Sequence, residues 1–162
     1  FGLGYLPQES SIFSDLSVEN NLLGVVELSA TDSQEASKIV TKLIDDFGLS
    51  KILNVKGRML SGGQRRKVEI ARTLISSPNL ILVDEPFAGI DPIAVEEIKE
   101  LVKEISKKDI SILITDHNVR ETLSLCDRAI ILVDGNIIAD GTEKQLKENE
   151  YVGQKYFGKM FS

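Results

Sequence analysis

The chain has 162 residues, of which 42% are hydrophobic and 27% charged, and its formal net charge at pH 7 is −6. This composition is typical of a globular domain with its own core, and the single cysteine, Cys126, permits no internal disulfide and fits a reducing compartment. The acidic balance provides no broad basic surface for nucleic acid, and no apolar run approaches the ~20 residues that a membrane-spanning helix needs.

A short strand is predicted first, over Gly2 to Leu6. It is expected to end at Pro7, because proline cannot continue a strand ladder. The next residues, 9–78, are predicted to form a helical insert. Its first helix is capped by Ser17, a residue type that favours helix starts, and is expected to end near residue 22.

Two further helices are predicted within the insert. The second closes at Gly48, a residue type common just after a helix, and is indicated by one apolar stripe at helical spacing: Ile39, Val40, Leu43, Ile44 and Phe47. The third begins at the Ser-Gly-Gly sequence of residues 61–63 and ends at 76–78, where two serines precede a proline. Arg65 to Lys67, near its start, is interpreted as a solvent-facing basic stretch.

After Pro78 the pattern changes from helical to alternating strands and helices. "LILVD" (Leu80 to Asp84) is a continuous apolar run, which predicts a strand buried on both faces. Asp91 then precedes a proline, a typical helix start, and an amphipathic helix is predicted through Ile105. Ile110 to Thr115 is predicted as a second buried strand, so strand, helix and strand form a right-handed parallel crossover.

The last third of the chain predicts a short helix, a hairpin and a final helix. The short helix covers about Asn118 to Leu125, and a strand follows over Ala129 to Val133. Asp134-Gly135 is a strong hairpin turn and returns the chain antiparallel. Thr142 and Gln145 fit a capping box for the last helix. The overall prediction is an α/β fold with a mostly parallel sheet.

Two adjacent carboxylates end the strand predicted at 80–84. Asp84 and Glu85 stand at the carboxyl edge, where open α/β sheets bind ligands. Asp84 is placed to hold Mg²⁺ through water, and Glu85 to polarise a water for attack on a γ-phosphate. The alternative is a pair of solvated acids at a strand end.

The turn that opens the third predicted helix can hold a phosphate. In "LSGGQ" (Leu60 to Gln64), Gly62 and Gly63 let backbone N–H groups approach an anion, and the helix N-terminus adds its positive end. Ser61 adds a hydroxyl donor and Gln64 an amide. Taken alone, the same turn is a simple helix cap. The 162 residues contain no G-x-x-x-x-G-K-[ST] loop, so such a phosphate site is incomplete.

Three further residues stand next to the predicted strands and the crossover helix. His117, the one histidine, follows the strand at 110–115, where its Nε2–H can donate to a γ-phosphate; the alternative is an incidental histidine. Gln8 follows the first strand, and its amide can touch Mg²⁺ or the attacking water. Asp91 is expected to cap its helix and to face a partner subunit.

Taken in chain order, these features resemble the ATP-binding cassette (ABC) ATPase family. The resembling segments are Gln8 as the Q-loop, Leu60 to Gln64 as the signature motif, Leu80 to Asp84 as the Walker B strand, Glu85 as the catalytic glutamate, Ala88 to Asp91 as the D-loop and His117 as the switch histidine. The resemblance covers essentially the entire chain. It implies a P-loop NTPase core with an inserted helical subdomain, and ATP and Mg²⁺ as cofactors.

The resemblance also implies four segments and a missing front part. We expect the Walker A loop and the adenine-stacking loop to lie upstream of Phe1, and the 162 residues alone to be inactive as an ATPase. The expected segments are 1–8 (end of the first core segment and Q-loop), 9–78 (helical subdomain with the signature motif), 79–142 (RecA-like core) and 143–162 (C-terminal helix and tail).

Members of this family act as head-to-tail dimers, in which the signature motif of one copy closes on ATP held by the other. The resemblance therefore implies a homodimer, with two transmembrane permease subunits as further partners. Several stretches, among them "DEPFAGIDPIAV" and "ITDHNVRETLSLCDRAIIL", and the tail "YVGQKYFGKMF", resemble lipopolysaccharide-export ATPases. That subtype implies a peripheral protein on the cytoplasmic side of the bacterial inner membrane. The alternatives are a branched-chain amino-acid importer ATPase and a half-cassette interaction module that does not hydrolyse ATP.

Overall fold

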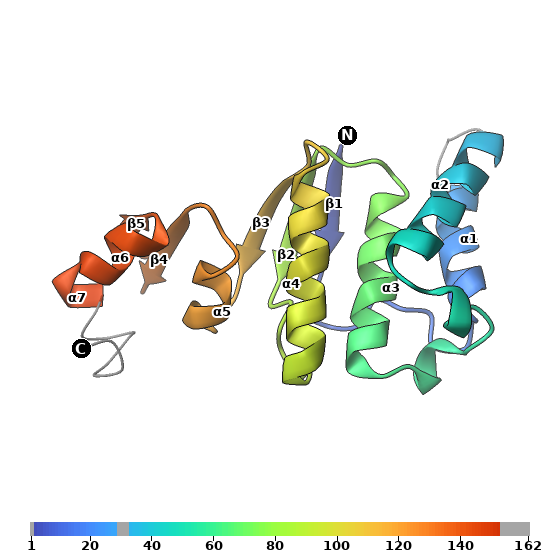
Figure 1. Ribbon diagram of the computed structural model, residues 1–162, viewed down its shortest axis with the longest axis horizontal. Helices are drawn as coiled ribbons and strands as arrows, with labels where there is room; N and C mark the ends of the chain where they lie inside the picture. Colours follow the sequence, from blue (N-terminus) through green and yellow to red (C-terminus); the bar gives the residue numbers. More distant parts are fainter. Residues whose placement is uncertain (1, 29–32, 153–162) are drawn as a thin grey trace. The chain divides into compact units, whose positions relative to one another are not determined.

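The computed structural model describes residues 2–28 and 33–152 of the chain, which divides into two compact units, 1–115 and 116–162 (Figure 1). The tail resemblance at 151–161 therefore lies mostly outside the described residues. The elements of the first unit are β1 (Leu3–Leu6), α1 (Val18–Leu28), α2 (Ser33–Asp46), the 3-10 turns η1 (Ser50–Ile52) and η2 (Gly57–Met59), α3 (Gly62–Leu74), β2 (Leu80–Asp84), α4 (Pro92–Ser106) and β3 (Ser111–Thr115).

The first unit is built on a three-stranded parallel sheet in the order β1-β2-β3. The register pairs Leu3 with Leu80 and Leu80 with Ser111, so the carboxyl ends of all three strands meet at one edge. Figure 1 shows α3 and α4 side by side over the sheet, with α3 in contact with β1 and α4 with β3. The predicted parallel crossover from β2 through α4 to β3 is confirmed.

The two faces of this sheet are unequally buried: the second face is half-buried along β2 and exposed along β3, so the prediction of strands buried on both faces is wrong. Leu6, Ile81 and Val83 are buried on the face that α3 and α4 cover. On the other face Tyr5 is 58% exposed and Leu113 is 56% exposed. A continuous apolar run predicts a hydrophobic strand, but it does not predict whether helices cover one face of the sheet or both.

The helical insert is confirmed, with one helix longer than predicted. Ser17 caps α1, because its Oγ accepts from the N–H of Asn20 at 3.1 Å. The helix continues through Gly24 to Leu28 rather than ending near residue 22, since it packs against α2 and α3. In α2 the predicted stripe is buried at Val40, Leu43 and Phe47, and Gly48 adopts φ = +61° just after the helix.

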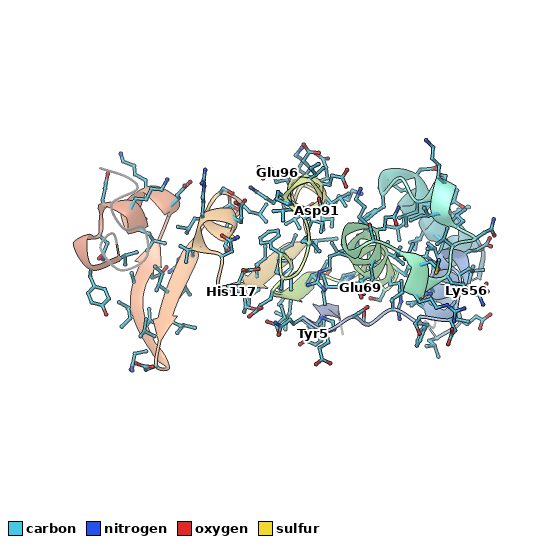
Figure 2. The ribbon with its side chains drawn as sticks, turned by 90° about the horizontal axis from the view of Figure 1, so that it is seen from below. Tyr5, Lys56, Glu69, Asp91, Glu96 and His117 are labelled. Atoms are coloured by element: carbon cyan, nitrogen blue, oxygen red, sulfur yellow. The ribbon has the colours of Figure 1, made fainter. Side chains whose placement is uncertain are left out.

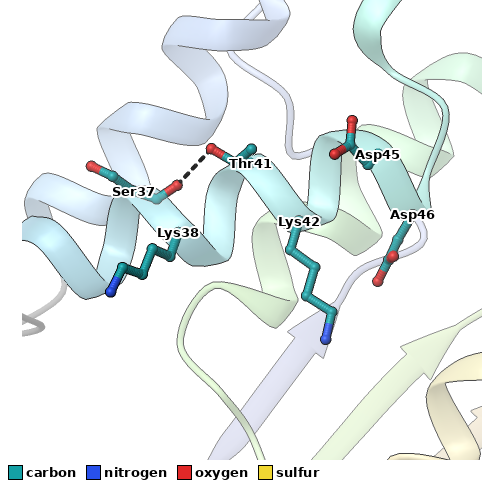
Figure 3. Close-up of a pocket in the computed structure, with 6 residues that line it drawn as sticks. All are labelled: Ser37, Lys38, Thr41, Lys42, Asp45 and Asp46. Atoms are coloured by element: carbon teal, nitrogen blue, oxygen red, sulfur yellow. Dashed lines mark hydrogen bonds between the residues drawn. The ribbon is translucent and has the colours of Figure 1, made fainter.

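The outer, polar side of α2 carries an open hollow (Figure 3). Its lining residues are Ser37, Lys38, Thr41, Lys42, Asp45 and Asp46. The Thr41 hydroxyl donates to the carbonyl of Ser37 at 2.9 Å, and Asp46 forms an ion pair with Lys108 at 2.9 Å. All six lining residues belong to one helix, so the hollow is a helix surface and not a site built from several elements.

The second unit contains α5 (Val119–Leu123), β4 (Ala129–Val133), β5 (Asn136–Gly141), α6 (Glu143–Glu148) and α7 (Glu150–Val152). The predicted hairpin is confirmed: β4 and β5 pair antiparallel through a turn in which Asp134 and Gly135 have φ of 50° and 77°. Thr142 and Gln145 form the predicted capping box of α6. Leu123, Leu146 and Val152 make a small core.

The surroundings shift the pKa of Asp140 and of Cys126 in the second unit. The guanidinium of Arg128 donates to Asp140, with Nε and Oδ1 2.7 Å apart, and this hydrogen bond holds the pKa of the Asp140 carboxyl below its usual range. Burial, with the nearby charge of Asp127, raises the pKa of the Cys126 thiol.

Among the described helices of the chain, none is long and apolar enough to cross a membrane.

Candidate functional site

Hydrogen bonds link the carboxyl ends of β2 and β3 at the position of the two predicted carboxylates. Asp84 is the last residue of β2 and Glu85 follows it directly. The backbone N–H of Glu85 donates to the carbonyl of Thr115 at 2.8 Å, and the hydroxyl of Thr115 donates to Oδ1 of Asp84. Both acids are therefore anchored to the end of the neighbouring strand, at the edge where ligands bind in open parallel sheets.

Gln8 reaches the same edge from β1. Its Nε2 donates to Oε2 of Glu85 at 2.7 Å, although the two residues are 77 positions apart in the sequence. Because β1 pairs parallel with β2, the chain leaves both strands on the same side of the sheet. The structure therefore brings together three predicted site residues: Gln8, Asp84 and Glu85.

Glu85 has an unusual backbone conformation. Its φ is +42°, in the left-handed region that residues other than glycine rarely adopt. Such a conformation costs about 1–3 kcal/mol and persists only where the surroundings hold it in place. Here the hydrogen bond to Thr115 holds the backbone, and strain of this kind is common at functional sites.

The signature turn begins α3 with a complete capping box. The N–H of Gln64 donates to Oγ of Ser61 at 3.2 Å, and the N–H of Ser61 donates to Oε1 of Gln64 at 3.0 Å. The hydroxyl hydrogen of Ser61 and the Nε2 of Gln64 are not used in this box. With the first N–H groups of the helix, which have no intrahelical partner, they form a set of donors suited to an anion.

The two glycines of this turn have a packing role that the sequence interpretation missed. A Cβ at Gly63 would lie 2.6 Å from the Cβ of Ala94 on α4, and one at Gly62 would lie 3.2 Å from Cγ2 of Ile90. The absence of side chains lets the start of α3 approach the segment before α4. This places the signature turn beside the segment that ends in Asp91.

Asp91 caps α4 as predicted. Its Oδ1 accepts from the N–H of Ala94 at 3.0 Å, and a proline occupies the first helical position. Figure 2 labels Asp91 at the start of this helix. Its predicted contact with a partner subunit stays a prediction.

His117 belongs to the second unit. Its side chain is 74% exposed, and its Nδ1 lies 3.9 Å from Oδ1 of Asp116, whose side chain is buried. Oδ1 of Asp116 accepts from the N–H of Asn118 at 2.7 Å, which orders the turn that carries the histidine. The role of His117 toward a γ-phosphate stays a prediction.

Arg66 was missed, and the interpretation of residues 65–67 as solvent-facing is wrong at this position. The residue is 6% exposed, and its guanidinium donates to the carbonyls of Pro7 (2.8 Å) and Asp84 (2.9 Å). Helical spacing could have indicated this, because Arg66 lies on the same side of α3 as Gly63 and Ile70, which are also buried. Three adjacent basic residues obscured the periodicity.

The carboxylate at the end of β2 is a suitable ligand for Mg²⁺ bound together with a nucleotide. Magnesium in phosphate-transfer sites is held by one or two carboxylates and the substrate's phosphate oxygens, rather than by a complete protein cage. Asp84 offers such a carboxylate at the strand edge, oriented by Thr115. In residues 2–28 and 33–152 no group of three or more His, Cys, Asp or Glu side chains forms a metal cage. The roles of Asp84 and Gln8 toward Mg²⁺ stay predictions.

Fold and site together define a nucleotide-binding α/β protein with an inserted helical segment. The ABC transporter family matches residues 2–88, and the chain belongs to this family. Among curated relatives it is 49% identical to the lipopolysaccharide export system ATP-binding protein LptB of Haemophilus influenzae and 44% identical to that of Escherichia coli K12. Each comparison covers 99% of this chain and 67% of the relative, so the chain spans about two thirds of their length.

Solved structures show the same fold. CbiO1 of Clostridium perfringens, part of the ABC transporter complex cbiONQ, matches with a TM-score of 0.82 and 29% identity over 95% of this chain and 62% of that one. An ATP-binding cassette of an ABC transporter in its ADP conformation matches with a TM-score of 0.80 and 28% identity, over 97% of this chain and 68% of that one. The predicted fold class, an ABC ATPase core with an inserted helical subdomain, is confirmed.

Proposed function

We propose that this chain is part of an ATP-hydrolysing subunit of an ABC transporter that acts in lipopolysaccharide export. The observation that carries the proposal is the contact between Gln8 and Glu85 at the carboxyl edge of the sheet, 2.7 Å between Nε2 and Oε2. A carboxylate held in a strained backbone at a ligand-binding edge, with an amide directed at it, suits the activation of a water molecule.

The roles of the site residues follow from this assignment. Asp84 holds Mg²⁺, which neutralises phosphate charge when bound, and Glu85 accepts a proton from the attacking water. Gln8 contacts the ion or that water, and His117 donates to the γ-phosphate.

The signature turn, Ser61 to Gln64, supplies the second half of the phosphate site in a head-to-tail homodimer. Its donors surround a helix N-terminus beside Asp91, while the 162 residues contain no G-x-x-x-x-G-K-[ST] sequence that these donors could face within one copy. We propose that the turn binds the phosphates of ATP held by the partner, with Asp91 near the interface.

The transported substrate is proposed from the relatives. Two curated relatives, 49% and 44% identical to this chain, are named for lipopolysaccharide export, and this favours that subtype. The proposal includes two transmembrane permease subunits and a peripheral place on the cytoplasmic side of the inner membrane. The segment boundaries after residues 8, 78 and 142 are kept as part of it.

Glu85→Gln in the full-length protein tests the ATPase assignment. The amide cannot accept the proton, so we expect kcat to fall by about 10²–10⁴-fold, the usual contribution of a general base. An ATP-bound dimer should then accumulate, detectable by light scattering after size exclusion in Mg²⁺ and ATP.

Glu104→Gln is the matched control, because this carboxylate is exposed on α4 and pairs with Lys107 away from the site. It should turn over like the unmutated protein. Hydrolysis by Glu85→Gln at the unmutated rate would contradict the role of Glu85.

A further inference from the structure

A buried ion pair on α3 contacts both segments that form the candidate site. Arg66 donates through Nη1 to the carbonyl of Pro7 at 2.8 Å and through Nη2 to the carbonyl of Asp84 at 2.9 Å. These carbonyls belong to the residues immediately before Gln8 and Glu85. One planar guanidinium therefore holds the backbone next to both side chains that meet at the strand edge.

Glu69 holds the same loop on the other side of Gln8. It is 3% exposed, and its Oε1 accepts from the hydroxyl of Ser10 at 2.8 Å and from the N–H of Ser11 at 2.9 Å. Its Oε2 lies 3.4 Å from Nη1 of Arg66. Figure 2 labels Glu69 on the side of α3 next to the chain that leaves β1. Gln8 is thus fixed by contacts at Pro7 and at Ser10.

Later parts of the loop are held by different residues. Nη1 of Arg72 donates to the carbonyl of Ser11 at 2.6 Å, and its guanidinium lies 4.7 Å from the centre of the Phe13 ring. The buried amide of Asn21 accepts from the N–H of Phe13 at 2.8 Å and donates to its carbonyl at 3.0 Å. The effect of Arg66 and Glu69 is therefore concentrated on residues 7–11.

The chemistry of the pair suits positioning. A buried carbonyl or N–H needs a partner, and the planar fork of arginine spans two carbonyls where a lysine ammonium is a single point. The pair connects α3, whose N-terminus carries the signature turn, to the loop of Gln8 and to the end of β2.

We propose that Arg66 and Glu69 are positioning residues that hold Gln8 against Glu85 and so set the rate of hydrolysis. The proposal rests on the proposed ATPase function, and neither residue is assigned a contact with nucleotide. Since a misplacement of about 1 Å in a catalytic group can cost ~10²-fold in rate, loosening the loop should lower kcat. The binding of ATP should change little.

The test is the double variant Arg66→Met with Glu69→Leu in the full-length protein. Both side chains are replaced by apolar ones of similar size, because removing one partner would leave a buried charge uncompensated. ATP turnover is measured well below the melting temperature of each variant, and amide hydrogen exchange is followed over residues 8–13. We expect kcat to fall about tenfold or more with KM for ATP within about threefold, and exchange to accelerate at Ser11.

Ser10→Ala is the second variant, in case the double variant folds poorly. It removes one hydrogen bond to Glu69 and leaves the ion pair in place, so a smaller fall in kcat and faster exchange over 8–13 are expected. Arg58→Gln is the control: its ion pair with Asp15 is exposed, and both kcat and exchange over 8–13 should stay unchanged.

The possible results separate this proposal from the proposed function. An unmutated full-length protein without ATPase activity contradicts the proposed function, while the exchange data still report whether the pair holds the loop. An active protein whose kcat is unchanged in a folded double variant, or in Ser10→Ala if only that variant folds, overturns the positioning role. A fall in kcat without faster exchange over residues 8–13 also overturns it, because the pair would then act elsewhere.

Discussion

At the scale of single residues, Glu85 combines a chemical role with a strained backbone. Its φ of +42° is unfavourable for a side chain with a Cβ, yet its N–H is bonded to Thr115 and its carboxylate to Gln8. The strain places the carboxylate at the strand edge beside the amide. Stability is lost at this position in exchange for a defined geometry.

This strain gives a stability prediction that differs from the activity prediction. Glu85→Gly and Glu85→Gln both remove the carboxylate, but glycine adopts positive φ without strain. We expect the free energy of unfolding of Glu85→Gly to exceed that of Glu85→Gln by about 0.5–1 kcal/mol, although both variants should hydrolyse ATP much more slowly than the unmutated protein. Urea denaturation of the two variants measures the difference.

The matched comparison is at Glu104, in the interior of α4. There Glu104→Gly should be less stable than Glu104→Gln by a few tenths to ~1 kcal/mol, because glycine is a poor helix former. The same order of stability at both positions would show that the backbone of Glu85 is not strained.

At the scale of elements, α3 serves two purposes on different sides. Its N-terminal turn presents donors suited to phosphate and packs closely on α4 through Gly63. Another side carries Arg66 and Glu69, which contact the loop after β1 and the end of β2. A rigid helix of 13 residues therefore links the signature turn to the carboxylate edge.

The close approach at the start of α3 gives a second prediction. Gly63→Ala would place a Cβ 2.6 Å from that of Ala94, so one helix must move. Overpacking of this kind costs about 1–3 kcal/mol, while the better helix propensity of alanine returns up to ~1 kcal/mol. We expect a net loss in free energy of unfolding of about 1 kcal/mol, measured by urea denaturation.

Gly24→Ala is the control for helix propensity alone. Gly24 lies inside α1, and a Cβ there meets nothing within 4 Å. This variant should gain about 0.5–1 kcal/mol. If Gly63→Ala were stabilised as much as Gly24→Ala, the helices would not be in the close contact described.

At the scale of the whole molecule, the proposed ATP hydrolysis and the proposed transport are supported by different observations. The proposed hydrolysis is supported by two contacts within the first unit, that of Gln8 with Glu85 and that of Thr115 with Asp84. No described residue has chemistry specific for a lipid, and the substrate is proposed from relatives of which this chain spans about two thirds. A substrate assay must therefore use the complete protein with the proposed membrane partners.

Such an assay gives the third prediction. In proteoliposomes that contain the full-length protein, the two proposed permease subunits and lipopolysaccharide, ATP should drive release of lipopolysaccharide to an acceptor protein. Glu85→Gln should reduce this release as strongly as it reduces hydrolysis, since both need the same carboxylate. ATP-driven uptake of leucine in its place would favour the amino-acid importer.

Much of the local structure was predictable because its causes lie close together in the sequence. Ser17, Ser61, Asp91 and Thr142 accept hydrogen bonds from N–H groups three residues on, so each cap could be read from residue types alone. The hairpin at Asp134-Gly135 follows from two residues that tolerate positive φ. The order of the motifs along the sequence likewise indicates the family.

The tertiary structure alone decided which distant groups meet and which surfaces are covered. Gln8 and Glu85 are 77 positions apart, and no local sequence pattern predicts that Nε2 of Gln8 lies 2.7 Å from Oε2 of Glu85. Arg66 belongs to a basic run that looks solvent-facing, and its burial appears only once the loop after β1 and the end of β2 pack against α3. Short-range preferences act within a few residues of the chain, whereas burial and long-range hydrogen bonds depend on which segments the fold brings together.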